Sequence, residues 1–175
     1  MKLKGLNDYD ICNYKDPAMF LIFPYCSFKC DHECGRPICQ NSKLAAAQEI
    51  ETTAIQLVKR YINNPLTHAI VCGGLEPFDS WDDLFSFCCV VRGFTNDTIV
   101  IYTGYKEDEI ENRIKSLSKL NNIVVKFGRF IPNSPHIFDA TLGVELASDN
   151  QYAKIISGDD NFEYSIANSG ENQNE

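Results

Sequence analysis

The sequence predicts an α/β fold built on a largely parallel β-sheet, and three observations support that class. Short apolar runs rich in β-branched residues alternate along the chain with longer segments of helical periodicity. The apolar runs are almost continuous, which is typical of parallel strands covered on both faces. The chain has 175 residues, which is enough for one domain with a sizeable core.

The first third of the chain is expected to contain one strand, a polar loop and one helix. Residues 1–17 are polar, which indicates a lead-in or an edge segment. Residues 18–24 are an apolar run closed by proline, and we expect a buried strand there. Apolar side chains recur at helical spacing over 43–62, and Asn63-Asn64-Pro65 ends that helix.

Strands and helices then alternate to the end of the predicted domain. The expected elements are strands at 68–72, 97–102 and 122–127, helices at 79–93 and 106–120, a possible fifth strand at 143–147 and a last short element at 150–156. We assign residues 1–157 to this one domain. Residues 158–175 contain few apolar side chains among Asp, Asn, Glu, Ser and Gly, which predicts a disordered tail.

Composition narrows the class of partner and the compartment. The formal net charge of −8 disfavours non-specific binding to nucleic acid. No apolar run approaches the roughly 18 residues that a membrane span needs. The first residues carry positive charge without the apolar segment of a signal peptide, so we expect a cytoplasmic protein.

Four of the eight cysteines lie within fourteen positions, directly after the first predicted strand. They are Cys26, Cys30, Cys34 and Cys39. Charged and polar neighbours indicate a loop rather than a core. In a reducing compartment such a cluster favours a metal or iron–sulfur site over a disulfide knot. Cys72, Cys88 and Cys89 lie in apolar segments and are expected to be buried structural thiols.

The segments with unusual composition all follow predicted strands. They are the cysteine loop, Gly73-Gly74-Leu75-Glu76-Pro77, Thr103-Gly104-Tyr105, Gly128-Arg129-Phe130 and Ser148-Asp149-Asn150-Gln151. The carboxyl ends of parallel strands meet at one edge of the sheet, where the sites of α/β proteins form. The sequence therefore predicts a single site at that edge.

Three motifs together resemble those of the radical S-adenosylmethionine (radical SAM) enzymes. They are Cys26-x3-Cys30 with a later cysteine before Gln40-Asn41, the Gly73–Pro77 segment, which has a leucine inserted into Gly-Gly-Glu-Pro, and Tyr102-Thr103-Gly104-Tyr105. The resemblance is closest to the activating proteins of anaerobic ribonucleotide reductase. It implies an incomplete (β/α)5–6 parallel barrel, open on one side, that holds a 4Fe-4S cluster with three cysteines. It also implies that S-adenosylmethionine binds the fourth iron.

The third cluster ligand is the point at which this chain departs from the family spacing, C-x3-C-x2-C. Position 33 is Glu33, so the third ligand after Cys26 and Cys30 is either Cys34 or Cys39. We favour Cys39 because Gln40-Asn41 follows it, similar to the pair that often follows the family's third cysteine. Cys34 then becomes a spare thiol, a neighbour of the cluster or a fourth ligand.

The resemblance also implies which residues bind the nucleotide and which proteins meet this one. The implied S-adenosylmethionine-binding residues are Gly73, Gly74, Glu76, Thr103, Ser148 and Asn150. Lys126 and Arg129 are candidates to bind a carboxylate. The implied partner is a glycyl-radical enzyme similar to anaerobic ribonucleotide reductase, and the implied electron donor is a flavodoxin or a ferredoxin.

Two alternatives stay open. In the first, the same cofactor chemistry acts on another protein or on a small molecule. A non-enzymatic alternative is a structural zinc site made by the four loop cysteines, although their spacing is looser than the paired C-x2-C of common zinc sites.

Overall fold

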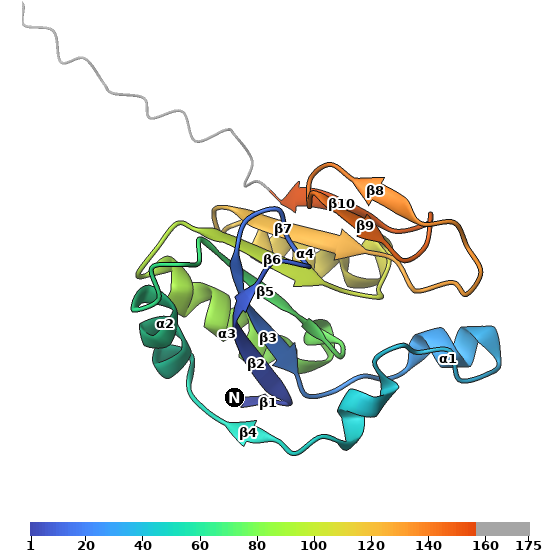
Figure 1. Ribbon diagram of the computed structural model, residues 1–175, viewed down its shortest axis with the longest axis horizontal. Helices are drawn as coiled ribbons and strands as arrows, with labels where there is room; N and C mark the ends of the chain where they lie inside the picture. The colour runs from blue at the N-terminus through green and yellow to red at the C-terminus, as the bar shows by residue number, and fades with distance from the viewer. Residues whose placement is uncertain (157–175) are drawn as a thin grey trace, which may run out of the picture.

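The computed structural model describes residues 1–156, so the tail predicted at 158–175 lies outside the described residues. A six-stranded sheet crosses the molecule in the order β10-β7-β6-β5-β3-β2 (Figure 1). Its strands are β2 (Gly5–Asp10), β3 (Ala18–Phe23), β5 (Ala69–Gly74), β6 (Thr98–Tyr102), β7 (Ile123–Phe127) and β10 (Tyr152–Ile156). The fold is thus mixed α/β.

The four central strands are parallel, and both edge strands are antiparallel to their neighbours. β3, β5, β6 and β7 pair in parallel and coincide with the four strands expected from the sequence, so those predictions are confirmed. The lead-in segment contains the edge strand β2, and the last short element is the opposite edge strand β10. The sheet is therefore parallel only in its centre, where each strand is covered on both faces.

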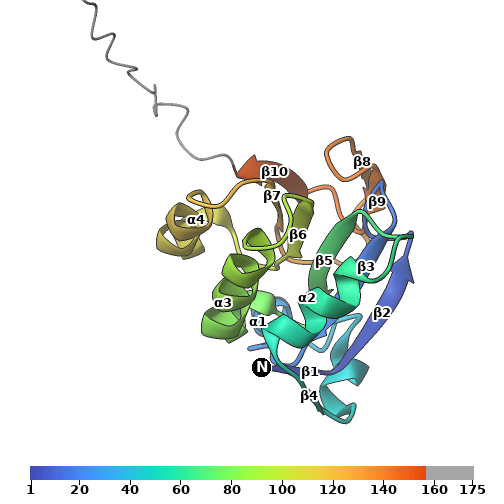
Figure 2. The same ribbon diagram turned by 90° about the vertical axis from the view of Figure 1, so that its left-hand side faces the viewer.

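Helices α2 (Ala54–Ile62), α3 (Trp81–Arg92) and α4 (Glu111–Leu117) cover one face of the sheet (Figure 2). The other face is covered by a hairpin of β8 (Ile137–Asp139) and β9 (Val144–Leu146) (Figure 2). Side chains alternate along the strands: Leu21 and Ile70 pack with the helices, whereas Ala69 and Val71 pack towards the hairpin. This alternation produces two buried clusters, one on each face of the sheet.

The prediction of one helix over residues 43–62 is wrong for the first half of that range. Residues Ser42–Ala46 form a single 3-10 turn (η1), and Ile50–Glu51 form β4, which pairs with β1 (Lys2–Leu3). A capping box starts α2 only at Ala54, because the Thr53 hydroxyl accepts from the Gln56 N–H and the Gln56 side chain accepts from the Thr53 N–H. Leu44, which contributed to the helical pattern, lines a cavity instead.

The possible fifth strand at 143–147 forms β9, but it belongs to the separate hairpin and not to the main sheet. Asp139 explains why the chain turns back there. Its carboxylate accepts the N–H of Leu142 at 2.9 Å, and its carbonyl accepts the N–H of Gly143, which has a φ of 73°. β9 ends at Leu146, and the main sheet is completed by β10, which begins at Tyr152.

The prediction that three cysteines outside the loop are buried is correct for two of them. Cys72 and Cys88 are fully buried, as expected, but Cys89 is exposed because the next position on α3 points away from the sheet. None of the helices in residues 1–156 is long and apolar enough to cross a membrane.

Candidate metal centre

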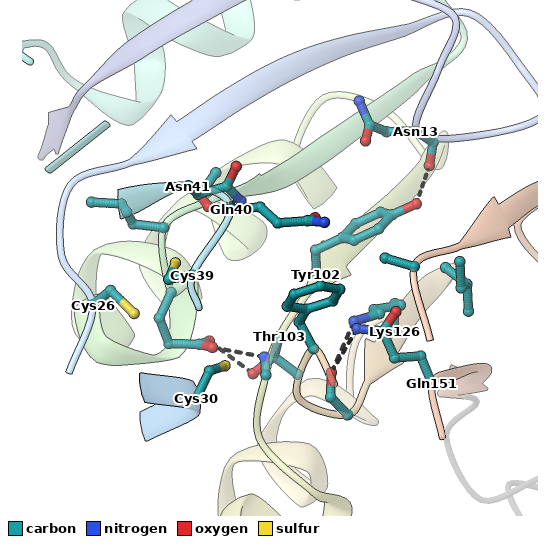
Figure 3. Close-up of a pocket in the computed structure, with 18 of the residues that line it drawn as sticks. Asn13, Cys26, Cys30, Cys39, Gln40, Asn41, Tyr102, Thr103, Lys126 and Gln151 are labelled. Carbon is teal, nitrogen blue, oxygen red and sulfur yellow. Dashed lines mark hydrogen bonds between the residues drawn. The ribbon is translucent and has the colours of Figure 1, made fainter. Parts of the chain in front are cut away.

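A cavity of about 430 Å³ lies where the loops leave the carboxyl ends of the parallel strands. Its wall comes from the cysteine loop, from the ends of β5, β6 and β7, and from hairpin residues 144–147. Figure 3 shows three cysteines on one side of this cavity and Lys126 and Gln151 on the opposite side, with Thr103 between them. The structure thus gathers most of the chemically distinctive segments at one edge of the sheet.

The cavity cysteines are Cys26, Cys30 and Cys39, and their sulfur atoms gather on one side of it (Figure 3). Cys34 does not line the cavity. It is exposed at the end of the short helix α1 (Lys29–Cys34). The geometry therefore brings Cys39, and not Cys34, to the other two thiols.

Partial burial favours the neutral form of the Cys26 and Cys30 thiols when no metal is bound. Burial raises the pKa of Cys26 to about 12, although the Phe28 N–H donates to its sulfur at 3.3 Å. Burial also raises the pKa of Cys30. Metal binding at this position would therefore release protons.

The cysteine loop is attached to the end of β5 and to the residues after it. The Ser27 N–H donates to the Asp79 carboxylate at 2.6 Å, and the Glu76 N–H donates to the Tyr25 carbonyl at 2.8 Å. On the other side of the loop, the Asn41 side chain donates to the Gly74 carbonyl at 2.8 Å. These bonds hold the thiols against the sheet.

Glu76 lines the cavity, yet its carboxylate is directed at the protein. It accepts hydrogen bonds from the Phe78 N–H at 3.1 Å, the Thr103 hydroxyl at 2.8 Å and the Gly104 N–H at 2.8 Å. Burial raises the pKa of Glu76 to about 7, and these three donors oppose the rise. Glu76 therefore joins the end of β5 to the turn after β6.

The two glycines that end β5 have different surroundings. Gly74 lines the cavity with a φ of 85°, and a Cβ there would lie 2.5 Å from Ile22 Cγ2. Gly73 does not line the cavity, and a Cβ there would lie 2.9 Å from the Phe20 ring. Both glycines allow β3 and β5 to approach closely, but only Gly74 faces the cavity.

Gly104 leaves room beside a cysteine. A Cβ built at Gly104 would lie 3.7 Å from Cys30 Sγ and 3.6 Å from Glu76 Oε2. The space next to the Cys30 sulfur is thus open on this side, which suits a group bound to that sulfur. Together with Thr103, Gly104 forms the wall contributed by the turn after β6.

Ser148 and Asn150 do not line this cavity, although they were expected to contact a nucleotide. The Ser148 hydroxyl is buried and accepts the Ile131 N–H at 3.3 Å, and Asn150 donates to the Arg129 carbonyl at 2.9 Å. Their side chains shape the segment after β7. The neighbouring Gln151 reaches the cavity in their place.

Lys126 is a buried cation in the cavity wall. It is 6% exposed, its Nζ donates to the Gly128 carbonyl at 2.9 Å, and burial lowers its pKa to about 8. Arg129, the other cationic candidate, does not line the cavity and instead pairs with Glu109 and Glu33. The signal for Lys126 in the sequence is one charged residue in an otherwise apolar strand.

Cys12, Asn13 and Phe20 also line the cavity, and sequence reasoning assigned them no role. The loop that carries Cys12 and Asn13 is held at the cavity because the Tyr102 hydroxyl donates to the Asn13 carbonyl at 2.7 Å. That contact joins residues far apart in the sequence, so no local sequence pattern predicts it.

Within residues 1–156 no three His, Cys, Asp or Glu side chains are close enough together to hold a single metal ion. A tetrahedral zinc ion bonds each sulfur at about 2.3 Å, which requires sulfurs about 3.8 Å apart. The exposed position of Cys34 adds to the disagreement with a four-thiolate zinc site.

A family model described as a 4Fe-4S single cluster domain matches residues 18–151. The match begins at the first residue of β3 and includes all four loop cysteines and the four parallel strands. Searches of curated proteins and of solved structures found no match.

Proposed function

This chain belongs to the 4Fe-4S single cluster domain family, and from that premise we propose that it is a radical SAM enzyme. The proposed activity is the reductive cleavage of S-adenosylmethionine, which installs a glycyl radical on a partner similar to anaerobic ribonucleotide reductase. One observation carries the proposal: three thiols converge on one side of a cavity whose other side carries a buried cation and polar groups.

The three cavity cysteines fit a cluster better than they fit one ion. In a 4Fe-4S cluster each thiolate binds a different iron, so the sulfurs need not lie as close together as around a single ion. Cys26, Cys30 and Cys39 would hold three irons, and the open space beside Gly104 adjoins the Cys30 sulfur. A metal site with one position free of protein ligands is the usual arrangement where a metal must meet a substrate.

The rest of the cavity fits a small polar molecule. Its volume of about 430 Å³ lies within the range of small-molecule sites, about 300–1,000 Å³. In S-adenosylmethionine the methionyl end carries an amino group and a carboxylate. Lys126 offers a positive charge for the carboxylate, while Thr103 and Gln151 offer hydrogen bonds. The low exposure of Lys126 strengthens its attraction for an anion.

When bound, such a cluster supplies the electron that breaks a sulfonium C–S bond and yields methionine and a 5′-deoxyadenosyl radical. The chain's own residues would bind the nucleotide, and the contacts of Ser27 and Asn41 hold the cysteine loop in place. The electron would come from a flavodoxin or a ferredoxin. The sequence resemblance supports the glycyl-radical partner, and a different protein or a small molecule is the alternative target.

The test is anaerobic reconstitution with iron and sulfide, followed by reduction in the presence of S-adenosylmethionine. We expect roughly four irons and four sulfides per chain, and methionine and 5′-deoxyadenosine as products. A Cys26→Ser variant is the control and should bind little iron. A chain that binds the cluster but never cleaves S-adenosylmethionine would contradict the proposed activity. For the active wild type, adding the reductase should produce a glycyl radical signal in electron paramagnetic resonance.

A further inference from the structure

The path of the chain between Cys30 and Cys39 is not fixed by packing. Eight residues separate these cysteines, and one of them is the exposed thiol of Cys34. Helix α1 contributes no buried side chain and ends at Gly35, which has a φ of 68° and donates its N–H to the His32 carbonyl. Other contacts must therefore bring Cys39 back to the cavity.

Asp31 supplies those contacts. Its Oδ1 accepts the N–H of Ile38 and the N–H of Cys39, each at 2.8 Å. Hydrogen bonds from successive backbone N–H groups to one carboxylate oxygen are charge-assisted and stronger than neutral ones. Asp31 directly follows Cys30 in the chain, so these two bonds join the position of one cavity thiol to that of another.

The helix that carries Asp31 is itself held at the edge of the sheet. Arg129 contacts the Glu33 carboxylate at 3.1 Å through Nε and the Glu109 carboxylate at 2.6 Å through a terminal nitrogen. Lys29 contacts Glu109 at 3.4 Å. Both ends of α1 are therefore joined to residues outside the loop, and Asp31 has a defined position from which to hold Ile38 and Cys39.

The downstream side of Cys39 is fixed as well. Asn41 is bound to the Gly74 carbonyl, and the Ser42 N–H donates to the Cys39 carbonyl at 3.3 Å. Both ends of the 31–39 loop are thus held by residues outside it, and the two hydrogen bonds to Asp31 join its two ends to each other. Beyond the bond from the Gly35 N–H to the His32 carbonyl, the described residues from Arg36 to Ile38 have exposed or half-buried side chains and no hydrogen bond to α1 other than those that Asp31 accepts.

We propose that Asp31 is a positioning residue that selects Cys39 over Cys34 as the third cluster ligand, by closing the 31–39 loop against α1. The proposal rests on the assignment of the cluster to this cavity and is independent of the reaction that the cluster supports. It explains how a chain with eight residues between two ligands can present three thiols to one cavity.

The first test uses the protein without iron and measures hydrogen exchange of individual amides. In Asp31→Ala we expect exchange at Ile38 and Cys39 to accelerate roughly ten-fold or more, as is typical for the loss of a hydrogen bond to a charged group. Asp31→Asn keeps an acceptor oxygen without the charge, so its exchange should be intermediate. His32→Ala is the matched control, because His32 is exposed on the same helix. Amides of β5 should exchange as in the wild type in every variant.

The second test measures iron per chain after anaerobic reconstitution. We expect Asp31→Ala to bind several-fold less iron than the wild type, and His32→Ala to bind the same amount. Cys34→Ser should leave the iron of the wild type unchanged but lower the residual iron of Asp31→Ala, because only the open loop lets Cys34 compete. A double-mutant cycle over these two positions measures that dependence.

The outcomes separate this proposal from the proposed function. Wild-type exchange at Ile38 and Cys39 in Asp31→Ala, or an equal effect of Cys34→Ser in both backgrounds, would overturn it. Faster exchange across β5 in Asp31→Ala would also overturn it, because Asp31 would then support the fold as a whole. If the wild type binds the cluster without cleaving S-adenosylmethionine, the proposed activity fails while the iron and exchange results still decide the role of Asp31.

Discussion

Cys34 and Cys39 have the same chemistry and lie five positions apart, yet only Cys39 lines the cavity with Cys26 and Cys30. We therefore expect Cys39→Ser to lower the iron content from roughly four per chain to near background. Cys34→Ser should keep the wild-type value. Iron and sulfide analysis after parallel reconstitution decides this, and a Cys34→Ser protein without its cluster would show that the sulfur takes part in binding.

At Gly104, a substitution is expected to affect iron binding without lowering the stability of the fold. A methyl group there meets its neighbours at 3.6–3.8 Å, which is ordinary van der Waals contact. Gly104→Ala should therefore leave stability unchanged or raise it by about 0.4–1 kcal/mol through the unfolded chain. The methyl group lies beside Cys30 Sγ, so we expect less iron per chain. Thermal unfolding and iron analysis of one preparation measure both effects, and unchanged iron would mean that the cluster avoids this wall.

Glu76 should make the stability of the iron-free protein depend on pH. Because burial raises its pKa from 4.5 to about 7, the folded state holds a proton that the unfolded state releases between these values. Its contribution is therefore most favourable below pH 4.5 and declines as pH rises to 7, by at most about 3 kcal/mol. Urea unfolding of the wild type and Glu76→Gln at pH 5 and pH 7.5 tests this. Gln cannot ionise, so the difference between the two proteins should shift with pH, and a constant difference would refute the assignment.

At the scale of elements, the approach of β3 to β5 depends on the last residue of β5. Gly74 and Gly35 both have positive φ, but a Cβ at Gly74 would clash with Ile22 whereas one at Gly35 meets nothing within 4 Å. Gly35→Ala should cost about 1–2 kcal/mol from the backbone conformation alone. Gly74→Ala should cost a further amount of about 1–3 kcal/mol from overpacking. Urea unfolding of both variants measures the difference, and equal losses would show that the strand contact is loose.

The elements that could be predicted from the sequence are those whose pattern agrees with their burial. β3, β5, β6 and β7 are almost continuous apolar runs because helices and the hairpin region cover both of their faces. The prediction for the segment before α2 is wrong because its apolar side chains make separate contacts and do not share one helix face. Leu44 and Ile50 fit a helical spacing, but Leu44 faces the cavity and Ile50 pairs with Leu3 in β4. Helical periodicity cannot distinguish those separate contacts from one helix face.

At the scale of the whole molecule, the sequence could place the cavity at the strand ends but not choose all of its residues. Topology brings Cys26, Gly74 and Thr103 together, because loops at the carboxyl ends of neighbouring parallel strands meet. The position of Cys12 depends on a bond between Tyr102 and Asn13 across the molecule. Ser148 and Asn150 share a motif with Gln151, but only Gln151 reaches the cavity, and a short motif does not specify which side chain faces inward.

The two buried clusters of the molecule contain no side chain from α1 or η1, so the core and the cysteine loop are largely separate. The loop is attached by polar contacts of Ser27, Glu33 and Asn41 that do not involve iron. We therefore expect removal of iron by a chelator to leave cooperative unfolding and the slow amide exchange of β5 and β6 in place. Faster exchange should be confined to the loop between Tyr25 and Ala47. Chelator-treated Cys39→Ser is the control and should show no change, since it starts with little iron. Loss of slow exchange in β5 on chelation of the wild type would show that the cluster holds the sheet together, which contradicts the separation of core and loop seen in the structure.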